Sequence, residues 1–422
     1  MRTNLQQNRF LKQQLEKFSG SRLIIITGAR QTGKTTLARA TYPHLNYVNL
    51  DAIEQREAMR EIRTDAWAAT VGPAILDEAQ KEPGVFDKVK YAYDAGELVQ
   101  TVLLGSSQIL MLQRVRETLA GRAYVFELWP LMAAELASEI PGDSLAPPLL
   151  DRLLVENGTA DEIFSPLPNV LIGEAANRGA AVIEHLSTWG GMPALLPLPD
   201  EERNKWLSSY ATAYLERDLG DLARLHDLMP FRHFQRLCAL RTSHLLSYAE
   251  LGRDAGLSGS TSRRYVEYLR LSYQAFTLPP YATNLTSTLV KTPKVYWSDI
   301  GLWRELTRYW GPATGQIFEN LVVSEIFKWV KTQDRKADLF FYRTRSGLEV
   351  DLLLITSSGV WGLEAKLTRR LASSDTRGLR TLQEAFGSQW RGGLVVYNGT
   401  KLEQLADNIW AVPAARLLLG NP

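Results

Sequence analysis

The stretch that decides the fold is Arg22-Leu-Ile-Ile-Ile-Thr27-Gly28-Ala-Arg-Gln-Thr-Gly33-Lys34-Thr35-Thr36. Its apolar part, residues 22–27, is typical of a strand that is buried on both faces of a parallel sheet. The remainder fits the pattern of Gly, four residues, Gly, Lys and Thr, and it lies between a strand and a helix, as that pattern requires. Glycines let backbone amides turn toward phosphate oxygens, and the helix that begins near Lys34 adds its positive end. The sequence therefore predicts a P-loop for a nucleoside triphosphate, formed by Gly28, Ala29, Arg30, Gln31, Thr32, Gly33, Lys34, Thr35 and Thr36.

The chemistry of this loop continues in a second strand. We expect Lys34 to reach the β and γ phosphates and Thr35 to hold Mg²⁺. The apolar strand 74–76 ends in Asp77-Glu78, where Asp77 is placed to hold Mg²⁺ through water and Glu78 to act as the general base. The alternative for this pair is an acidic helix start. The sequence thus predicts ATP hydrolysis, with ATP and Mg²⁺ as cofactors.

Further polar residues are candidates for the same site. The strand 101–104 runs into Gly105-Ser106-Ser107-Gln108, and ligands of such sheets lie at this carboxyl edge. Ser106 or Ser107 is a candidate sensor of the γ phosphate, with a helix cap as the alternative. Arg122 and Arg217 are candidates for a cation that acts from a neighbouring subunit, with a surface or packing role equally open.

Composition limits the class of protein. A chain of 422 residues suggests two to four domains, at roughly 150 residues per domain. Because 48 basic residues nearly balance 46 acidic ones, whole-chain charge neither favours nor excludes nucleic acid. The single cysteine, Cys238, lies in an apolar helical stretch, so we expect a core residue in a reducing compartment. No signal peptide or bilayer-spanning stretch is recognisable, which predicts a cytoplasmic protein without a membrane partner.

The order of patterns predicts an α/β protein. Apolar strands alternate with helices in the N-terminal third, as in a doubly wound parallel sheet. A segment rich in Pro, Gly and acidic residues follows from about 140, then helical patterning, and β-like runs return from about 290. We predict these units: 1–20, an N-terminal helix; 21–137, the P-loop ATPase domain; 138–230, an insertion and helical lid or connector; 231–285, a further helical unit; and 286–422, a second α/β domain.

The middle region suits DNA contact. Residues 246–258 fit a short helix and a turn, and residues 261–269 fit a second helix capped by hydroxyl residues, the spacing of a helix-turn-helix. Residues 275–280 then supply a wing. Arg263, Arg264 and Arg270 are candidates for contact with the DNA backbone. The alternative is a winged helix that serves only as a protein-interaction or lid module.

The C-terminal region carries an ensemble of charged residues. Glu319 lies in the amphipathic helix 316–330, Asp351 opens an apolar strand, and Glu364 and Lys366 leave the same face of the next strand. This order is the arrangement of PD-(D/E)xK nucleases, in which the carboxylates bind one or two Mg²⁺ ions and the lysine orients the nucleophile.

Two arginines beside these residues favour a phosphodiester substrate. Arg343 and Arg345 lie in the strand and turn that precede Asp351, where guanidinium groups suit phosphate. The alternative is a buried ion cluster in a nuclease-like fold that has lost its activity.

With these motifs in place, the chain resembles prokaryotic AAA-type ATPases whose C-terminal half, long catalogued as a domain of unknown function, joins a winged helix to a restriction-endonuclease-like domain. The resemblance rests on TGARQTGKTTLA, AILDEAQ, LLGSSQ, LAGR, WGGMPALL, YLERDLGDL, VYWSDIGLWREL, FEN, EVDLLL and GLEAKL. It implies an ATPase that acts in DNA transactions, as a homo-oligomer. The alternative is a nucleotide-dependent signalling or assembly switch with an inactive C-terminal interaction domain. The segment 140–175 departs from the family by its length.

Overall fold

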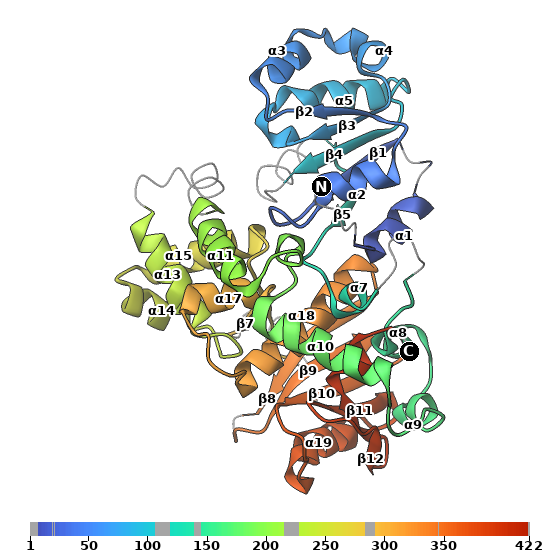
Figure 1. Ribbon diagram of the computed structural model, residues 1–422, viewed down its shortest axis with the longest axis vertical. Coiled ribbons are helices and arrows are strands. Elements are labelled where there is room, and N and C mark those ends of the chain that lie inside the picture. Colours follow the sequence, from blue (N-terminus) through green and yellow to red (C-terminus); the bar gives the residue numbers. More distant parts are fainter. Residues whose placement is uncertain are drawn as a thin grey trace.

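The structure is a computed structural model that describes residues 7–18, 20, 22–105, 119–138, 145–214, 228–282, 292–344 and 346–420. A sheet domain built by the N-terminal part lies at one end of the molecule, a second sheet built by the C-terminal part lies at the other, and helices occupy the space between them (Figure 1). Among the described helices, none is both long and apolar enough to cross a membrane.

The N-terminal sheet has five strands in the order β2-β3-β4-β1-β5, all parallel. The strands are β1 (Leu23–Thr27), β2 (Asn46–Asn49), β3 (Ala74–Asp77), β4 (Thr101–Gly105) and β5 (Tyr124–Glu127). Every residue of β1 is buried, because Ile24 and Ile26 face one core cluster and Leu23 and Ile25 face another. The predicted parallel α/β domain is confirmed.

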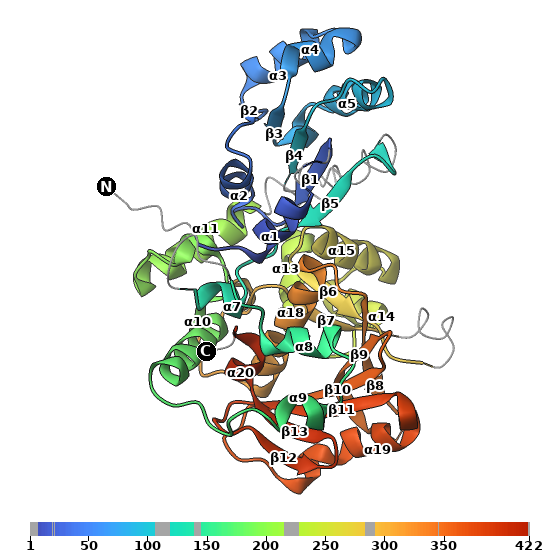
Figure 2. The same cartoon turned by 90° about the vertical axis from the view of Figure 1, so that its right-hand side faces the viewer.

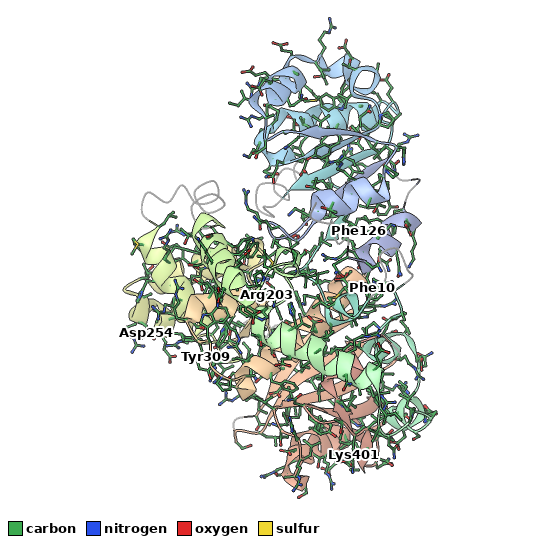
Figure 3. The ribbon with its side chains drawn as sticks, in the orientation of Figure 1. Phe10, Phe126, Arg203, Asp254, Tyr309 and Lys401 are labelled. Carbon is green, nitrogen blue, oxygen red and sulfur yellow. The ribbon has the colours of Figure 1, made fainter. Side chains whose placement is uncertain are left out.

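Helices cover both faces of this sheet. On one side lie α1 (Phe10–Lys17) and α2 (Lys34–Thr41), and on the other lie α3 (Ile53–Glu61), α4 (Trp67–Val71) and α5 (Gly84–Asp94). Figure 2 shows α2 and α5 on opposite sides of the strands. Phe10 of α1 reaches beyond the domain (Figure 3) and packs edge-on against Trp329, with ring centroids 4.7 Å apart.

The middle of the chain is helical. It comprises α7 (Ala133–Leu136), α10 (Glu174–Trp189), α11 (Asp200–Tyr214), α13 (Met229–Ala239), α14 (Tyr248–Ala255), α15 (Gly259–Leu271) and α17 (Ile300–Thr307). The turn between α14 and α15 depends on Gly256, whose φ of 68° is left-handed, and on Ser258, whose hydroxyl accepts a hydrogen bond from the Thr261 amide at 3.1 Å.

A short two-stranded sheet follows these helices. Strand β6 (Ala275–Leu278) pairs antiparallel with β7 (Lys294–Trp297). The sequence places these strands on opposite sides of the predicted boundary at 285/286. In the structure the two strands pair through backbone hydrogen bonds. No local sequence pattern predicts this pairing, because the two strands are far apart in the chain.

The C-terminal sheet is mixed, with the order β12-β13-β11-β10-β9-β8. Its elements are α18 (Gly315–Thr332), β8 (Ala337–Arg343), β9 (Glu349–Thr356), β10 (Val360–Lys366), α19 (Arg377–Phe386), β11 (Trp390–Tyr397), β12 (Glu403–Ala406), β13 (Ile409–Pro413) and α20 (Ala414–Leu418). Strands β8, β9 and β10 are antiparallel, whereas β10, β11 and β13 are parallel. Helix α18 packs on one face and α19 on the other.

Two helices from the segment expected to be an insertion belong to this C-terminal body. They are α8 (Leu149–Val155) and α9 (Ala160–Phe164). Asp151 of α8 accepts hydrogen bonds from Trp329 Nε1 at 2.8 Å and Arg335 Nη2 at 2.7 Å, and Asp161 of α9 accepts one from Trp410 Nε1 at 2.6 Å. The segment therefore stabilises the C-terminal domain.

Candidate functional site

The P-loop connects β1 to α2 through two glycines that no other residue can replace without strain. Gly28 has a φ of 151°, and a Cβ atom there would lie 2.2 Å from the Leu128 carbonyl oxygen. Gly33 has a φ of 94° and precedes the first turn of α2. Both positions need the freedom of glycine, so the sequence pattern reflects backbone geometry as well as phosphate binding.

Lys34 and Thr35 hold contacts that a nucleotide would exchange. The Lys34 ammonium donates to the carbonyl oxygens of Gly28 at 2.9 Å and Ala29 at 2.7 Å. The Thr35 hydroxyl donates to Asp77 Oδ2 at 2.6 Å, so the two predicted Mg²⁺ ligands lie side by side at the end of β3. Their hydroxyl and carboxylate oxygens are the ligands that Mg²⁺ prefers. Thr35 and Asp77 therefore fit this ion.

Tyr47 of β2 is a member of this site that sequence analysis missed. Its hydroxyl donates to Asp77 Oδ2 at 2.9 Å. Burial and the neighbouring Asp77 carboxylate both raise the pKa of Tyr47, so the phenol stays protonated and remains a donor. It helps to fix Asp77 toward Thr35.

Glu78 is held by its own neighbours. Its φ of 54° is left-handed, and its amide donates to Asp77 Oδ1 at 2.9 Å. The side-chain amide of Gln80 donates to Glu78 Oε2. Gln80 was also missed, although it completes the Asp77-Glu78-Ala-Gln80 run; it orients the predicted general base.

The remaining candidates of the nucleotide site are placed elsewhere or not described. Arg122 forms an ion pair with Asp94 of α5, with Nε to Oδ1 at 2.6 Å and Nη2 to Oδ2 at 3.0 Å. Ser106, Ser107 and Arg217 lie outside the described residues.

Groups from other parts of the chain contact the P-loop backbone. Arg9, the residue just before α1, donates to the Thr32 carbonyl at 2.9 Å and to Glu135 Oε1 at 3.2 Å. The Tyr210 hydroxyl of α11 donates to the Arg30 carbonyl at 3.3 Å. Each contact ties the loop to elements outside the ATPase sheet.

Tyr273 makes a similar connection beneath the loop. Its hydroxyl lies 2.5 Å from Thr27 Oγ1, at the end of β1. Tyr273 follows α15 by two residues, so the P-loop strand directly contacts the helix-turn-helix region.

Helices α13, α14 and α15 form a basic unit. The segment 229–271 contains seven arginines against three acidic residues, whereas the whole chain has a formal net charge of only +2. Arg263 and Arg264 are exposed, and the Arg263 guanidinium lies 5.1 Å from the centre of the Tyr248 ring. Arg270 is exposed but donates to Glu267 Oε2 at 2.7 Å, so it is already paired.

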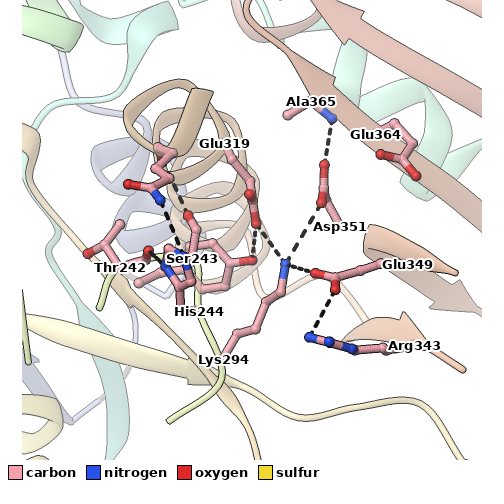
Figure 4. Close-up of polar contacts among 12 residues, drawn as sticks. Thr242, Ser243, His244, Lys294, Glu319, Arg343, Glu349, Asp351, Glu364 and Ala365 are labelled. Carbon is pink, nitrogen blue, oxygen red and sulfur yellow. Dashed lines mark hydrogen bonds and ion pairs between the residues drawn. The ribbon is translucent and has the colours of Figure 1, made fainter. Parts of the chain in front are cut away.

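In the C-terminal domain, the predicted nuclease residues converge. Glu319 comes from α18, Asp351 from β9 and Glu364 from β10 (Figure 4). Lys366 is also part of β10. The Asp351 Oδ2 atom accepts a hydrogen bond from the Ala365 amide at 2.9 Å, and Lys366 Nζ lies 3.0 Å from Glu364 Oε2. A cavity of about 470 Å³, lined in part by Asp351, Glu364 and Lys366, opens beside them.

Lys294 lies at the centre of this group and was missed by sequence analysis. Its ammonium is 3.0 Å from Glu319 Oε1, 2.5 Å from Glu349 Oε1 and 3.8 Å from Asp351 Oδ1. Burial alone would lower the pKa of Lys294, but the three carboxylates outweigh it and raise the pKa, so the ammonium stays charged. Glu349 was also missed, although its place two residues before Asp351 puts both on one face of β9.

Burial and the nearby Asp351 carboxylate raise the pKa values of two acids in this cluster. They raise the pKa of Glu319 to about 7 and that of Glu364 to about 8.

Arg343 Nη1 lies 3.3 Å from Glu349 Oε2, and Arg345 lies outside the described residues. Within the described part of the chain, no group of three His, Cys, Asp or Glu side chains is arranged to hold a metal ion.

Comparison with family models divides the chain in the same order. Residues 20–137 match the AAA domain, residues 181–310 match "Domain of unknown function (DUF8612)", and residues 314–417 match "Domain of unknown function (DUF4143)". The chain thus carries an AAA-type P-loop ATPase domain followed by these two domains. Domains of the AAA type generally use ATP and Mg²⁺.

Individual relatives extend over most of the chain. The uncharacterized proteins Rv2008c of Mycobacterium tuberculosis and Mb2031c of Mycobacterium bovis are each 26% identical over 406 residues, which cover 94% of this chain and 81% of theirs. The chain is homologous to Rv2008c.

Similar solved structures include two archaeal ATPases. The Walker-type ATPase PABY2304 of Pyrococcus abyssi has a TM-score of 0.44 and 16% identity, covering 72% of this chain and 97% of its own. A signal-transduction ATPase of Pyrococcus horikoshii, PH0952, has a TM-score of 0.28 and 13% identity, covering 79% of this chain and 48% of its own. No functional conclusion follows from similarities this distant.

Proposed function

We propose that this protein is an Mg²⁺-dependent ATPase that acts on DNA, and that its nucleotide state controls how the C-terminal half grips DNA. The observation that carries the DNA part is the local basic excess of α13–α15, with seven arginines against three acidic residues in a chain that is otherwise nearly balanced. Local basic surface, rather than net charge, is what binding to a phosphate backbone requires.

The ATPase part of the proposal assigns roles to five residues. Lys34 exchanges the Gly28 and Ala29 carbonyls for phosphate oxygens, and Thr35 and Asp77 hold Mg²⁺, which neutralises phosphate charge. Glu78, oriented by Gln80, accepts a proton from the attacking water. Glu78 is the group whose removal should stop hydrolysis while nucleotide still binds.

The DNA part assigns α15 as the helix that approaches the duplex. Arg263 and Arg264 lie near its N-terminal end and are exposed, the position from which the second helix of a helix-turn-helix contacts DNA. Ser258, Ser260 and Thr261 surround that end with hydroxyl groups, which suit phosphate oxygens.

Control of this unit by nucleotide is supported by the contacts behind the P-loop. Tyr273 connects Thr27 to the end of α15, and Tyr210 and Arg9 contact backbone carbonyls of the loop itself. A change in the loop on nucleotide binding would therefore alter contacts of the helical middle directly.

The order α18-β8-β9-β10-α19-β11, with Glu319, Asp351, Glu364 and Lys366 near one another, supports a nuclease-like fold for the C-terminal domain. We propose that this domain grips DNA.

One observation favours a second candidate, a nucleotide-dependent signalling or assembly switch: the ion pairing of Glu319 with Lys294 suits an inactive interaction domain. A homo-oligomer is part of both candidates, with Arg122 acting across the interface once it leaves Asp94.

The test measures DNA binding and ATP hydrolysis with duplex, single-stranded and branched DNA. The double variant Arg263→Ala/Arg264→Ala should weaken binding to all sequences alike and reduce the salt slope by about 2, or about 1 per lost phosphate contact. Arg270→Ala is the matched control, because that guanidinium is already paired with Glu267. Hydrolysis that ignores all three DNAs, with binding unchanged in the double variant, would leave only the switch.

A further inference from the structure

A nuclease-like fold implies a divalent metal ion held by Glu319, Asp351 and Glu364. In this structure, Glu319 and Glu364 already have other partners. Glu319 accepts hydrogen bonds from Lys294 Nζ at 3.0 Å and from the Tyr296 hydroxyl at 2.7 Å. Glu364 is paired with Lys366 at 3.0 Å. Each of these acids already has a partner with the opposite charge or a donor hydrogen.

Lys294 takes the position that would join the first two ligands. Its ammonium contacts Glu319 and lies 3.8 Å from Asp351 Oδ1, with Glu349 closing the third side (Figure 4). The side chain is only 3% exposed, so it is built into the interior. An Mg²⁺ ion needs oxygens at about 2.0–2.1 Å, and one shared by Glu319 and Asp351 would overlap the ammonium.

The local charge balance agrees with this geometry. Four carboxyl groups, those of Glu319, Glu349, Asp351 and Glu364, lie beside three cations, those of Lys294, Lys366 and Arg343. Little negative charge is left to offset the cost of stripping water from a divalent ion. The place between Glu319 and Asp351, as arranged, does not fit the metal that the fold implies.

We infer that Lys294 is the resident cation of this cluster, that it replaces the divalent ion of a nuclease centre, and that the C-terminal domain binds no such ion through Glu319 and Asp351. Lys294 belongs to β7, whereas its partners belong to α18 and β9. The ion pairs of this ammonium therefore connect the β6–β7 sheet to the C-terminal sheet. The inference concerns the metal alone and holds whether or not the protein binds DNA.

The experiment is Mn²⁺ titration of the full-length, nucleotide-free chain, followed by the electron paramagnetic resonance of free Mn²⁺. The parent is Asp77→Asn, which removes the P-loop carboxylate. We expect no Mn²⁺ site in the parent that depends on Asp351. Lys294→Met should create one site per chain, with an Mn²⁺ affinity about 30-fold or more above any residual binding by the parent, because a nearby positive charge is gone. Asp351→Asn should remove this site again.

Lys366→Met is the matched control, since it deletes the other lysine of the cluster without vacating the place between Glu319 and Asp351; it should create no site. Binding in the parent that disappears with Asp351→Asn would overturn the inference, as would Asp351-dependent cleavage of DNA in Mn²⁺. A folded Lys294→Met variant that binds no Mn²⁺ would also overturn it. If Lys294→Met does not fold, the parent with and without Asp351→Asn still decides the matter.

Discussion

Arg9 offers the sharpest test of how the P-loop is supported. Its guanidinium is 9% exposed and donates to Glu135 Oε1 at 3.2 Å, to the Thr32 carbonyl at 2.9 Å and to the Trp129 carbonyl. Arg9→Ala removes all three hydrogen bonds. Among the residues that the structure describes, this leaves Glu135, which is fully buried, with the amides of Phe10 and Met132 as its remaining donors.

The magnitude follows from the burial of the pair. Removing one partner of a buried ion pair costs about 3–5 kcal/mol, because the remaining charge is left without compensation. The two amides that still donate to Glu135 offset part of this cost, so we expect a loss of about 3 kcal/mol in the free energy of unfolding. Arg9→Lys keeps the charge but cannot donate to three acceptors in a fixed plane, so its loss should be smaller.

Urea unfolding followed by circular dichroism measures this loss. The matched control is Arg63→Ala, because Arg63 pairs with Asp65 at 2.7 Å while its side chain is 81% exposed; its effect should be much smaller than that of Arg9→Ala, since solvent screens an exposed ion pair. Nucleotide affinity of Arg9→Ala should also fall, since Thr32 belongs to the P-loop. An Arg9→Ala variant as stable as Arg63→Ala would refute the assignment of Arg9 as a buried support.

Three other predictions concern the nucleotide site and pH. Lys34→Ala should lower nucleotide affinity and hydrolysis by about 100-fold or more, because it loses charge-assisted bonds to phosphate; fluorescent-nucleotide titration and a phosphate-release assay check this. Gln80→Ala should lower kcat about tenfold with an unchanged KM, since it frees Glu78 without touching the nucleotide; a change in KM alone would contradict it. Burial lowers the pKa of His185 from 6.5 to about 4, so between these values the unfolded chain binds a proton that the folded chain excludes. Stability should fall by up to about 3 kcal/mol as pH drops through this window, and His185→Gln should flatten the fall measured by urea unfolding; an unchanged fall would assign it to other groups.

The parts of the fold that sequence could predict are those encoded locally. The run Leu23–Thr27 is apolar on both faces because both faces of β1 are covered, and Gly28 and Gly33 are needed for backbone conformations within the same few residues. Asp77 could be predicted because a short buried strand ends at it. Each of these features needs only neighbouring residues to be recognised.

The parts that sequence could not predict depend on distant partners. Lys294 stands in an ordinary strand, and its partners Glu319, Glu349 and Asp351 come from two elements that follow much later in the chain. Arg9 likewise meets Thr32 and Glu135 only after α1 packs beside the sheet. No local spacing distinguishes such residues from surface charges, whereas Glu349 was recognisable from its alternation with Asp351.

Helix α18 contacts both halves of the molecule. Near its start, Glu319 pairs with Lys294, and Asn320 exchanges hydrogen bonds with the backbone of Trp297 at 2.7 and 2.9 Å, so α18 is fixed to β7.

Two turns later, α18 contacts the segment that leaves the P-loop domain. Glu325 accepts a hydrogen bond from the Ala133 amide at 2.7 Å, and Phe327 packs against Trp129 and Phe276, with ring centroids 5.3 and 3.9 Å apart. Close-packed interiors transmit displacement rather than absorb it. A shift of the strand end beneath the P-loop would therefore disturb buried contacts of α18, the helix that Lys294 joins to β7 and β9.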